Sequence, residues 1–271
     1  MVLRLLKTLS ENKANIKNEK AEKLFEEADI LLKGNDADRS SALSLLRENE
    51  QEFSDNADFL WRLAKALQMQ ATKHKALNNK EKQKEFIVEG NFLLNFVKRN
   101  NFYKFYNFIS ILGLQYAEKA LSLDISNPDA HKWFAILTGM LGDFLTTKEK
   151  IQNGYLFQKH LATALEGRPD DATLYHLLGR FKFEVSNLSW IEKKLASTLF
   201  AELPPVTFPD AINDFLKAED LNPKPWKENR LLLAKCYAGD GQHQEALNWL
   251  DSAKAVEALT EDVSIAKLDN F

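Results

Sequence analysis

The sequence is poor in residues that interrupt helices and in residues that cross-link a chain. Its 271 residues include only 10 glycines and 7 prolines, about half of the usual share for the two together. β-Sandwiches, β-barrels and α/β folds with many tight turns use more of both, so we expect long helices joined by short loops. The single cysteine, Cys236, excludes an internal disulfide and any zinc site built from cysteines.

The sequence has neither a large excess of one sign of charge nor a long apolar run. With 36 basic and 39 acidic residues the formal net charge is −3, so no overall positive field attracts nucleic acid. The most apolar stretch, residues 105–117, contains Asn107, Ser110 and Gln115 and is shorter than the ~20 residues of a membrane helix. Acidic residues soon follow residues 1–9, which favours an ordinary first helix over a targeting segment. We expect a soluble protein without a membrane span or a nucleic-acid partner.

Motifs for catalysis and cofactor binding are also missing. The five histidines are scattered and form no zinc-binding pair at helical spacing, and neither a nucleophile elbow nor a phosphate-binding loop occurs. His131 and His176 fall at equivalent positions of two predicted helices, which we interpret as repeat geometry because further metal ligands are lacking. The sequence therefore predicts no enzyme, no cofactor and no metal.

An internal repeat is the most informative feature of the second half. Helices that pack closely need small residues where they face each other, and large residues beside them fill the groove between neighbouring repeats. Two successive units show this spacing, which is typical of tetratricopeptide (TPR) repeats. The first unit has Tyr175, Leu178 and Gly179 on one helix and Ala211, Phe215 and Ala218 on the next; the second has Leu233, Ala234 and Tyr237, then Ala246, Leu250 and Ala253, with Asp240-Gly241 between them.

Earlier units are less regular. One contains Trp133 and Ile136, a turn at Gly142-Asp143 and a second helix with Leu161 and Ala164; another runs from residues 59–72 to Ala117 and Ala120; a first, weak pair covers residues 17–52 and breaks at residues 34–36. Hairpins of this kind cannot bury their apolar faces alone, so they stack. We predict an all-α, TPR-like helical-hairpin superhelix, a solenoid forming a single domain over residues 1–271. It has weak repeats at about 17–123, clear repeats at about 129–254 and a C-terminal capping helix at about 260–271.

Two segments depart from the repeat period. Residues 187–203 contain an amphipathic pattern with Trp190, Leu195 and Leu199 that ends at Pro204-Pro205, which predicts an inserted helix. The second segment, residues 91–112, is rich in Phe, Tyr, Ile, Lys and Asn and lies between Gly90 and Gly113. It is either a translated intron or lineage-specific extension, or part of a lengthened helix at about 80–123, and the sequence leaves both interpretations open.

Several runs of residues match something more particular than a general TPR pattern. They are Ala130-His131-Lys132-Trp133-Phe134-Ala135-Ile136, Asp171-Ala172-Thr173-x-x-His176-Leu177-Leu178-Gly179-Arg180, Leu203-Pro204-Pro205, Phe215-x-x-Ala218-Glu219 and Trp226-x-x-Asn229-x-Leu231-Leu232-Leu233-Ala234-Lys235. Together these runs resemble the regulator of microtubule dynamics family over residues 114–260, and more loosely upstream. The Leu-Pro-Pro sequence after a Trp-containing helix is similar to that family and is not shared by ordinary TPR proteins.

This resemblance implies a non-enzymatic protein that associates with microtubules and spindle poles and acts in chromosome segregation. Some members of the family are found at mitochondria or tether the endoplasmic reticulum to them, through N-terminal segments outside the repeats. Only residues 1–10 precede the first polar helix here. We therefore expect the cytoplasm, the cytoskeleton, the spindle and the spindle pole, with the mitochondrion as the less favoured alternative.

The first helix of each stacked unit is expected to line a concave groove. A groove with a guanidinium and an ammonium group suits an acidic peptide, such as a tubulin tail, with salt-sensitive affinity. In the alternative, Arg180 and Lys235 pair with nearby acids such as Glu184 or Asp240 and bind nothing. The predicted groove residues are His131, Phe134, His176, Arg180, Phe183, Asn229 and Lys235.

Two basic runs are interpreted as solvated helix faces. One comprises Lys73, Lys75, Lys80, Lys82 and Lys84, and the other is Lys193-Lys194.

Two further functions stay open at this point. The protein is a peptide-binding adaptor for chaperones or signalling proteins, or it is an organelle-contact or lipid-handling protein of the same family.

Overall fold

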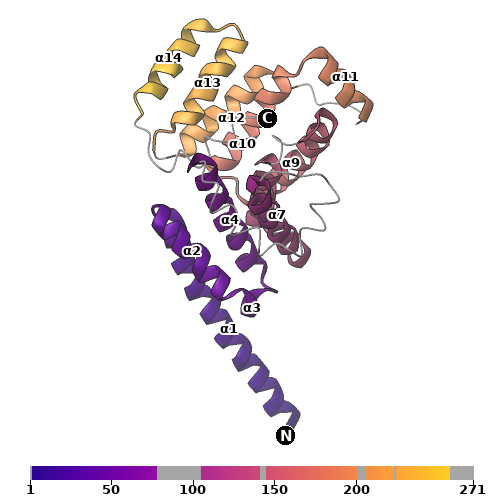
Figure 1. Ribbon diagram of the computed structural model, residues 1–271, viewed down its shortest axis with the longest axis vertical. Coiled ribbons are helices and arrows are strands. Elements are labelled where there is room, and N and C mark those ends of the chain that lie inside the picture. Colours follow the sequence, from indigo (N-terminus) through magenta and orange to yellow (C-terminus); the bar gives the residue numbers. More distant parts are fainter. Residues whose placement is uncertain (1, 78–104, 141–144, 200–205, 223, 257–271) are drawn as a thin grey trace.

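The computed structural model describes residues 2–77, 105–140, 145–199, 206–222 and 224–256. Every regular element in these ranges is a helix, and the helices pair as antiparallel hairpins that follow one another along the chain (Figure 1). The prediction of an all-α stack of helical hairpins is therefore confirmed.

The first hairpin consists of α1 (Val2–Lys33) and α2 (Asp36–Glu48), followed by the single turn α3 (Glu50–Phe53). The predicted break at residues 34–36 is confirmed. The Asn35 side chain caps α2 by accepting hydrogen bonds from the backbone N–H groups of Ala37 and Asp38, and the Asp38 carboxylate accepts one from Asn35 N–H. This reciprocal cap satisfies backbone donors that a helix start leaves free, so α2 begins sharply.

The second hairpin pairs α4 (Ala57–Leu77) with α7 (Phe105–Leu123). It contains the predicted first helix at residues 59–72, and the small residues Ala64, Ala117 and Ala120 are fully buried in it. Residues 78–104 lie outside the described part of the chain. Most of the lengthened helix expected at 80–123, and most of the translated intron or lineage-specific extension expected at 91–112, therefore lies outside the described residues. The described part begins with α7 at Phe105.

The third hairpin pairs α8 (Pro128–Met140) with α9 (Thr147–Gly167). Thr146 and Glu149 form a capping box at the start of α9, where the Thr146 hydroxyl accepts from Glu149 N–H and the Glu149 carboxylate accepts from Thr146 N–H. The predicted turn at Gly142-Asp143 lies outside the described residues. Residues 129–140 supply a nearly continuous buried face, because α8 packs against α4, α7 and α9.

The fourth hairpin pairs α10 (Ala172–Asn187) with α12 (Phe208–Leu221), and α11 (Trp190–Leu199) is inserted between them. The predicted inserted helix is thus confirmed as far as Leu199. A Cβ atom added to Gly179 would lie 2.9 Å from Cδ1 of the buried Phe215 ring. The absence of a side chain at Gly179 therefore allows α10 and α12 to approach closely, as the repeat pattern predicts.

The last described hairpin pairs α13 (Lys227–Gly239) with α14 (His243–Lys254). Its turn contains Gly241 with φ of +80°, a left-handed conformation that glycine adopts without steric cost. The predicted turn at Asp240-Gly241 is confirmed. The predicted capping helix at 260–271 lies outside the described residues.

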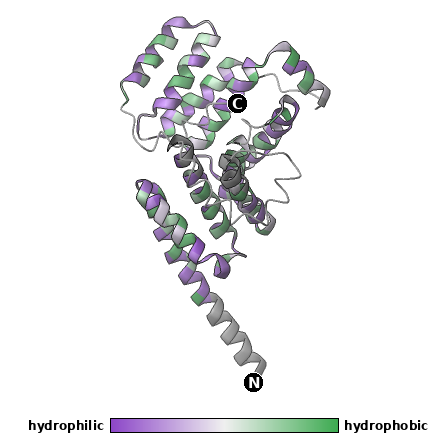
Figure 2. Ribbon diagram, viewed as in Figure 1, coloured by the Kyte–Doolittle hydropathy of each residue, from purple (hydrophilic) through white to green (hydrophobic). Residues whose placement is uncertain are grey.

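Each hairpin packs against the next one, and the main core cluster runs from α1 to α10. A second, smaller cluster lies between α12 and α13 and includes Phe215, Leu233 and Cys236. Most helices show green apolar stripes alternating with purple hydrophilic ones (Figure 2), as expected where one face of a helix is buried. The exception to close packing is α11, which contacts mainly α9 and exposes 73% of Trp190 and of Ile191.

Candidate functional site

Most of the predicted groove residues are buried between helices and are not available as a surface. His131, Phe134, His176, Arg180 and Asn229 are all buried, whereas Phe183 is half-buried and Lys235 is exposed. The structure therefore does not assemble these seven side chains into one accessible groove. The physical reason is that the helix face predicted to line a groove also packs against neighbouring hairpins.

His131 and Phe134 hold α8 against α9. His131 Nε2 lies 2.8 Å from the carbonyl oxygen of Ile125, and its Nδ1 lies 2.8 Å from Nδ1 of His160. The His160 ring in turn stacks on Phe134 with ring centroids 4.0 Å apart. Burial, followed by the neighbouring His131, lowers the pKa of His160 to about 4. His160 is therefore neutral at physiological pH, and its contacts with His131 and Phe134 pack the third hairpin.

His176 and Asn229 form the polar centre of the joint between the fourth and fifth hairpins. Asn229 Nδ2 donates to the Phe215 carbonyl at 2.9 Å and to Glu219 Oε1 at 3.0 Å. Its Oδ1 therefore accepts, at 2.9 Å, from a protonated Nδ1 of His176. The His176 ring also stacks on Trp226 with centroids 4.1 Å apart. Because both side chains are 0% exposed, they fix the helices rather than meeting a ligand.

Arg180 differs from the other buried groove residues because it lines a pocket. Its Nη1 lies 3.5 Å from Glu228 Oε1, which is a long ion pair, and its Nε has no hydrogen-bond partner although the residue is only 6% exposed. The alternative considered from the sequence was pairing with a nearby acid such as Glu184; the ion pair that the structure shows is with Glu228 of α13. Arg180 is thus the one predicted groove residue that the structure places at both a buried ion pair and a cavity.

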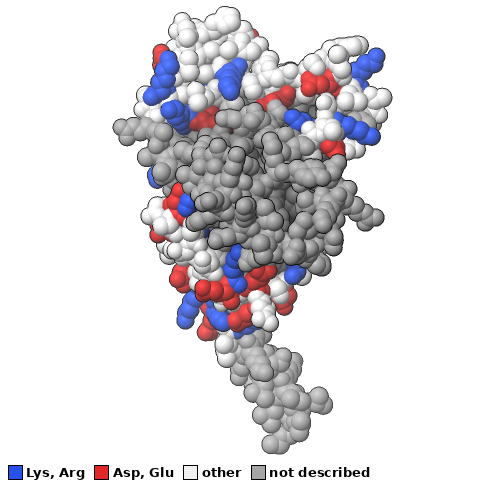
Figure 3. Space-filling view, viewed as in Figure 1, with Lys and Arg blue, Asp and Glu red and all other residues white. Residues whose placement is uncertain are grey.

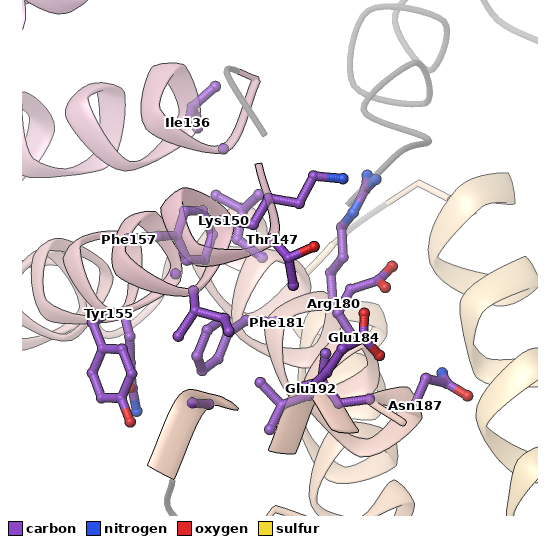
Figure 4. A pocket seen from close by; sticks show the side chains of 18 residues that line it. Ile136, Thr147, Lys150, Tyr155, Phe157, Arg180, Phe181, Glu184, Asn187 and Glu192 are labelled. Atoms are coloured by element: carbon purple, nitrogen blue, oxygen red, sulfur yellow. The ribbon is translucent and has the colours of Figure 1, made fainter. Parts of the chain in front are cut away.

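The pocket has a volume of about 330 Å³ and lies where the third and fourth hairpins meet beneath α11 (Figure 4). Its walls come from the end of α8, from α9, from α10 and from α11. Most of the wall is apolar and aromatic, while Lys150, Arg180, Glu184 and Glu192 are its charged members. The apolar residues are Ile136, Ile151, Phe157, Leu177, Phe181, Val185, Leu188 and Ala196.

Sequence reasoning missed this pocket. The residues of α9 that line it, such as Ile151, Gly154 and Gln158, recur at the three- and four-residue spacing of one helix face. That signal was present, but it is the same signal that a packed face gives. The space arises because α11 is inserted beside α9 and α10. The spacing of residues within one helix does not show how far that helix lies from its neighbours.

Three further cations, Arg62, Lys65 and Lys132, lie on α4 and α8, the first helices of the second and third hairpins. Arg62 pairs with Asp29 at 2.8 Å, and Lys132 pairs with Asp171 at 2.5 Å. Lys65 forms no ion pair with a described residue, and its ammonium lies 5.6 Å from the centre of the Trp133 ring. Burial above all lowers the pKa of Lys65 to about 8; Asp29 opposes this shift, while Lys132, Lys33 and Arg62 add to it.

The structure describes the two basic runs to different extents. Lys193 and Lys194 are exposed on α11, and Lys194 lies 5.1 Å from the centre of the Trp190 ring. Lys73 is half-buried on α4, whereas Lys80, Lys82 and Lys84 lie outside the described residues. In the view of Figure 3, lysines and arginines are interspersed with acids over the described surface and form no continuous basic face.

Nothing in the described residues points to a metal site or a reactive thiol. They contain no group of three or more His, Cys, Asp or Glu side chains placed to hold a metal ion. Cys236 is buried in the second cluster, and this burial raises the pKa of its thiol to about 12. No described helix is long and apolar enough to cross a membrane.

Comparisons with known proteins give one consistent family. The model for "Regulator of microtubule dynamics protein 1-3" matches residues 24–269. Regulator of microtubule dynamics protein 3 from Xenopus laevis is 35% identical over 88% of this chain and 46% of that protein. Regulator of microtubule dynamics protein 2 from Mus musculus is 32% identical over 92% of this chain and 54% of that protein. The chain therefore spans about half the length of these curated relatives.

Solved structures offer only a distant likeness. A crystal structure of MamA aligns with a TM-score of 0.43 at 13% identity, over 80% of this chain and 88% of that one. MamA from Desulfovibrio magneticus aligns with a TM-score of 0.42 at 15% identity, over 90% of this chain and 92% of that one.

Proposed function

Because the chain belongs to the regulator of microtubule dynamics family, we propose that it is a non-enzymatic binding protein that associates with microtubules. In this proposal it acts at the spindle and spindle poles, in microtubule dynamics and chromosome segregation. The observation that carries the proposal is the family match over residues 24–269, together with the names of the relatives.

The partner surface proposed on the microtubule is the acidic tail of tubulin. Two lysines on first helices support this choice, because their ammonium groups are not held in ion pairs within the described part of the chain. Lys65 lies on α4 among other cations, and Lys235 is exposed on α13; neither forms an ion pair with a described residue. Several such contacts along a disordered acidic chain give weak but additive attraction, which salt screens over about 10 Å at 0.1 M.

Co-sedimentation with polymerised tubulin tests the proposal. The protein is expected in the pellet at low salt and increasingly in the supernatant as salt is added. Absence from the pellet at low salt overturns the microtubule proposal. The salt series matters because an apolar contact would be strengthened or unchanged by the same addition.

A matched pair of double variants tests which lysines are responsible. Lys65→Gln with Lys235→Gln removes two positive charges from the first helices, and Lys193→Gln with Lys194→Gln removes two from α11. The first pair is expected to weaken binding by about tenfold, and the second by less than threefold. The opposite order assigns binding to the basic run of α11 and overturns the part of the proposal that concerns Lys65 and Lys235.

The proposed cellular location has its own experiment. Fluorescent tags placed in turn at each terminus are expected to label the spindle and its poles in dividing cells and the cytoplasm otherwise. Label confined to mitochondria would contradict the spindle location and favour the organelle-contact function considered from the sequence. Tagging both ends separately ensures that a masked terminal signal does not decide the result.

A further inference from the structure

The pocket beneath α11 combines an apolar interior with a buried cation whose hydrogen-bonding capacity is unused. Phe157 and Phe181 stack in its wall with ring centroids 5.9 Å apart, and Tyr155 stands at its edge. Ligand pockets usually measure about 300–1,000 Å³ and carry a few polar groups that orient the ligand. At about 330 Å³, this pocket suits one large side chain and is too small for a lipid with two acyl chains.

Arg180 provides the reason to expect a ligand rather than an empty packing defect. The residue is only 6% exposed, and its Nε has no hydrogen-bond partner. Its Nη1 lies 3.5 Å from Glu228 Oε1, which is long for an ion pair. A buried charge is costly unless it is well paired. A carboxylate brought into the pocket would supply the missing acceptor, and its fork geometry matches a guanidinium.

Lys150 is the second cation of the pocket, whose lining also includes the carboxylates of Glu184 and Glu192. Lys150 is half-buried on α9 and forms no ion pair with a described residue. Figure 4 shows its ammonium and the Arg180 guanidinium extending toward the same end of the pocket. Glu192 is already engaged, because it accepts from Ser189 N–H at 2.8 Å and from Ser189 Oγ at 2.6 Å. Glu184 also has a partner of its own.

We propose that this pocket binds the C-terminal residue of a peptide, with an aromatic side chain in the apolar cavity and the terminal carboxylate between Arg180 and Lys150. Phe157 and Phe181 offer edges and faces to the aromatic ring. A terminal residue fits better than an internal one, because its carboxylate enters together with its side chain and the chain leaves in one direction only. This proposal goes beyond microtubule association and does not depend on it.

Fluorescence anisotropy with a labelled synthetic peptide, Glu-Gly-Glu-Gly-Glu-Phe with a free carboxylate, tests the proposal on the full chain. Saturable binding is expected. Amidation of the carboxyl end, or replacement of the final Phe by Ala, should each weaken binding about tenfold, since each removes one of the two recognised groups. Equal binding of the free and amidated peptides, or no binding of the free peptide, overturns the proposal.

Variants locate the site without disturbing the buried ion pair. Lys150→Gln is expected to weaken binding of the free peptide about tenfold and to leave the amidated peptide unchanged. Gly154→Leu places a side chain into the cavity and should abolish binding, while Gly154→Ala should retain most of it. The added Cβ at Gly154 has its nearest neighbour, Phe181 Cε2, at an ordinary 3.6 Å. Melting curves confirm that both variants fold, and full binding by folded Gly154→Leu overturns the location.

Discussion

Two glycines show how one missing side chain decides the distance between helices. Gly179 on α10 and Gly154 on α9 both lie inside helices, where glycine is disfavoured by about 1 kcal/mol relative to alanine. At Gly179 the space for a Cβ is taken by the Phe215 ring, which is fully buried and cannot move aside. At Gly154 the same space is open to a pocket. The same residue type therefore has a packing role at one position and leaves room at the other.

This contrast predicts opposite effects of the same substitution. Gly179→Ala should lower the free energy of unfolding by about 1–3 kcal/mol, because overpacking outweighs the gain in helix propensity. Gly154→Ala should raise it by up to about 1 kcal/mol, because its Cβ makes only ordinary contact. Urea denaturation of the two variants beside the natural protein measures both effects. A Gly179→Ala variant as stable as the natural protein would show that α10 and α12 can separate freely.

At the scale of elements, α11 stands apart from the other helices. It is held by a cap at its start, where Ser189 and Glu192 bond to each other, and by the fully buried Ala196 on its inner face. It leaves Trp190 and Ile191 largely exposed. α12 begins with an equivalent cap between Thr207 and Asp210, but its buried face packs against both α10 and α13. Equal caps therefore support unequally packed helices.

Removing the two caps should separate local from global stability. Ser189→Ala is expected to speed amide hydrogen exchange within α11 about fivefold, since a lost cap costs about 1 kcal/mol, with little change in the free energy of global unfolding. Thr207→Ala should lower global stability by about 1 kcal/mol, because α12 unfolds only with the core. Exchange measured by mass spectrometry, together with urea denaturation, distinguishes the two. A global loss for Ser189→Ala would mean that α11 belongs to the cooperative core.

For the whole molecule, the buried contact between His176 and Asn229 links the fourth hairpin to the fifth. Burial first of all, and then the nearby Arg180, lower the pKa of His176 from 6.5 to about 3, and its hydrogen bond with Asn229 opposes this only in part. The unfolded chain therefore binds a proton at His176 more readily than the folded protein does. The stability that neutral His176 provides is fully present above about pH 6.5 and is lost as the pH falls toward 3.

This shift predicts a contribution of His176 to the pH dependence of stability, which the pKa of His160, also lowered, shares. Between pH 7.5 and pH 5, His176 should account for a loss of roughly 2 kcal/mol in the free energy of unfolding. His176→Gln should be less stable at neutral pH but should lose less on acidification, as urea denaturation at a series of pH values would record. The control is His243→Gln, at an exposed position of α14, which should follow the natural protein. Equal slopes for all three proteins would exclude His176 as a source.

Residues that pack within one hairpin could be placed from the sequence, whereas a residue at the joint between two hairpins could not. Tyr175, Gly179 and Phe215 could be placed from their spacing because small and large residues alternate at fixed helical positions wherever two helices pack. The role of Asn229 could not, because a polar residue on the first helix of a hairpin fits an open groove and a buried joint equally well. Which of the two occurs depends on the neighbouring hairpin, and that packing involves residues distant in the sequence.

The sequence by itself determined the helices, their pairing and most turns, because these depend on local spacing, on caps such as Asn35 with Asp38, and on glycine at Gly241. It also determined the family, through runs of residues shared with it. Only the tertiary structure decided which side chains meet solvent. Stacking buried His131, His176 and Asn229, and the insertion of α11 opened a pocket beside Arg180. Accessibility depends on the distance between elements, and helical spacing does not encode that distance.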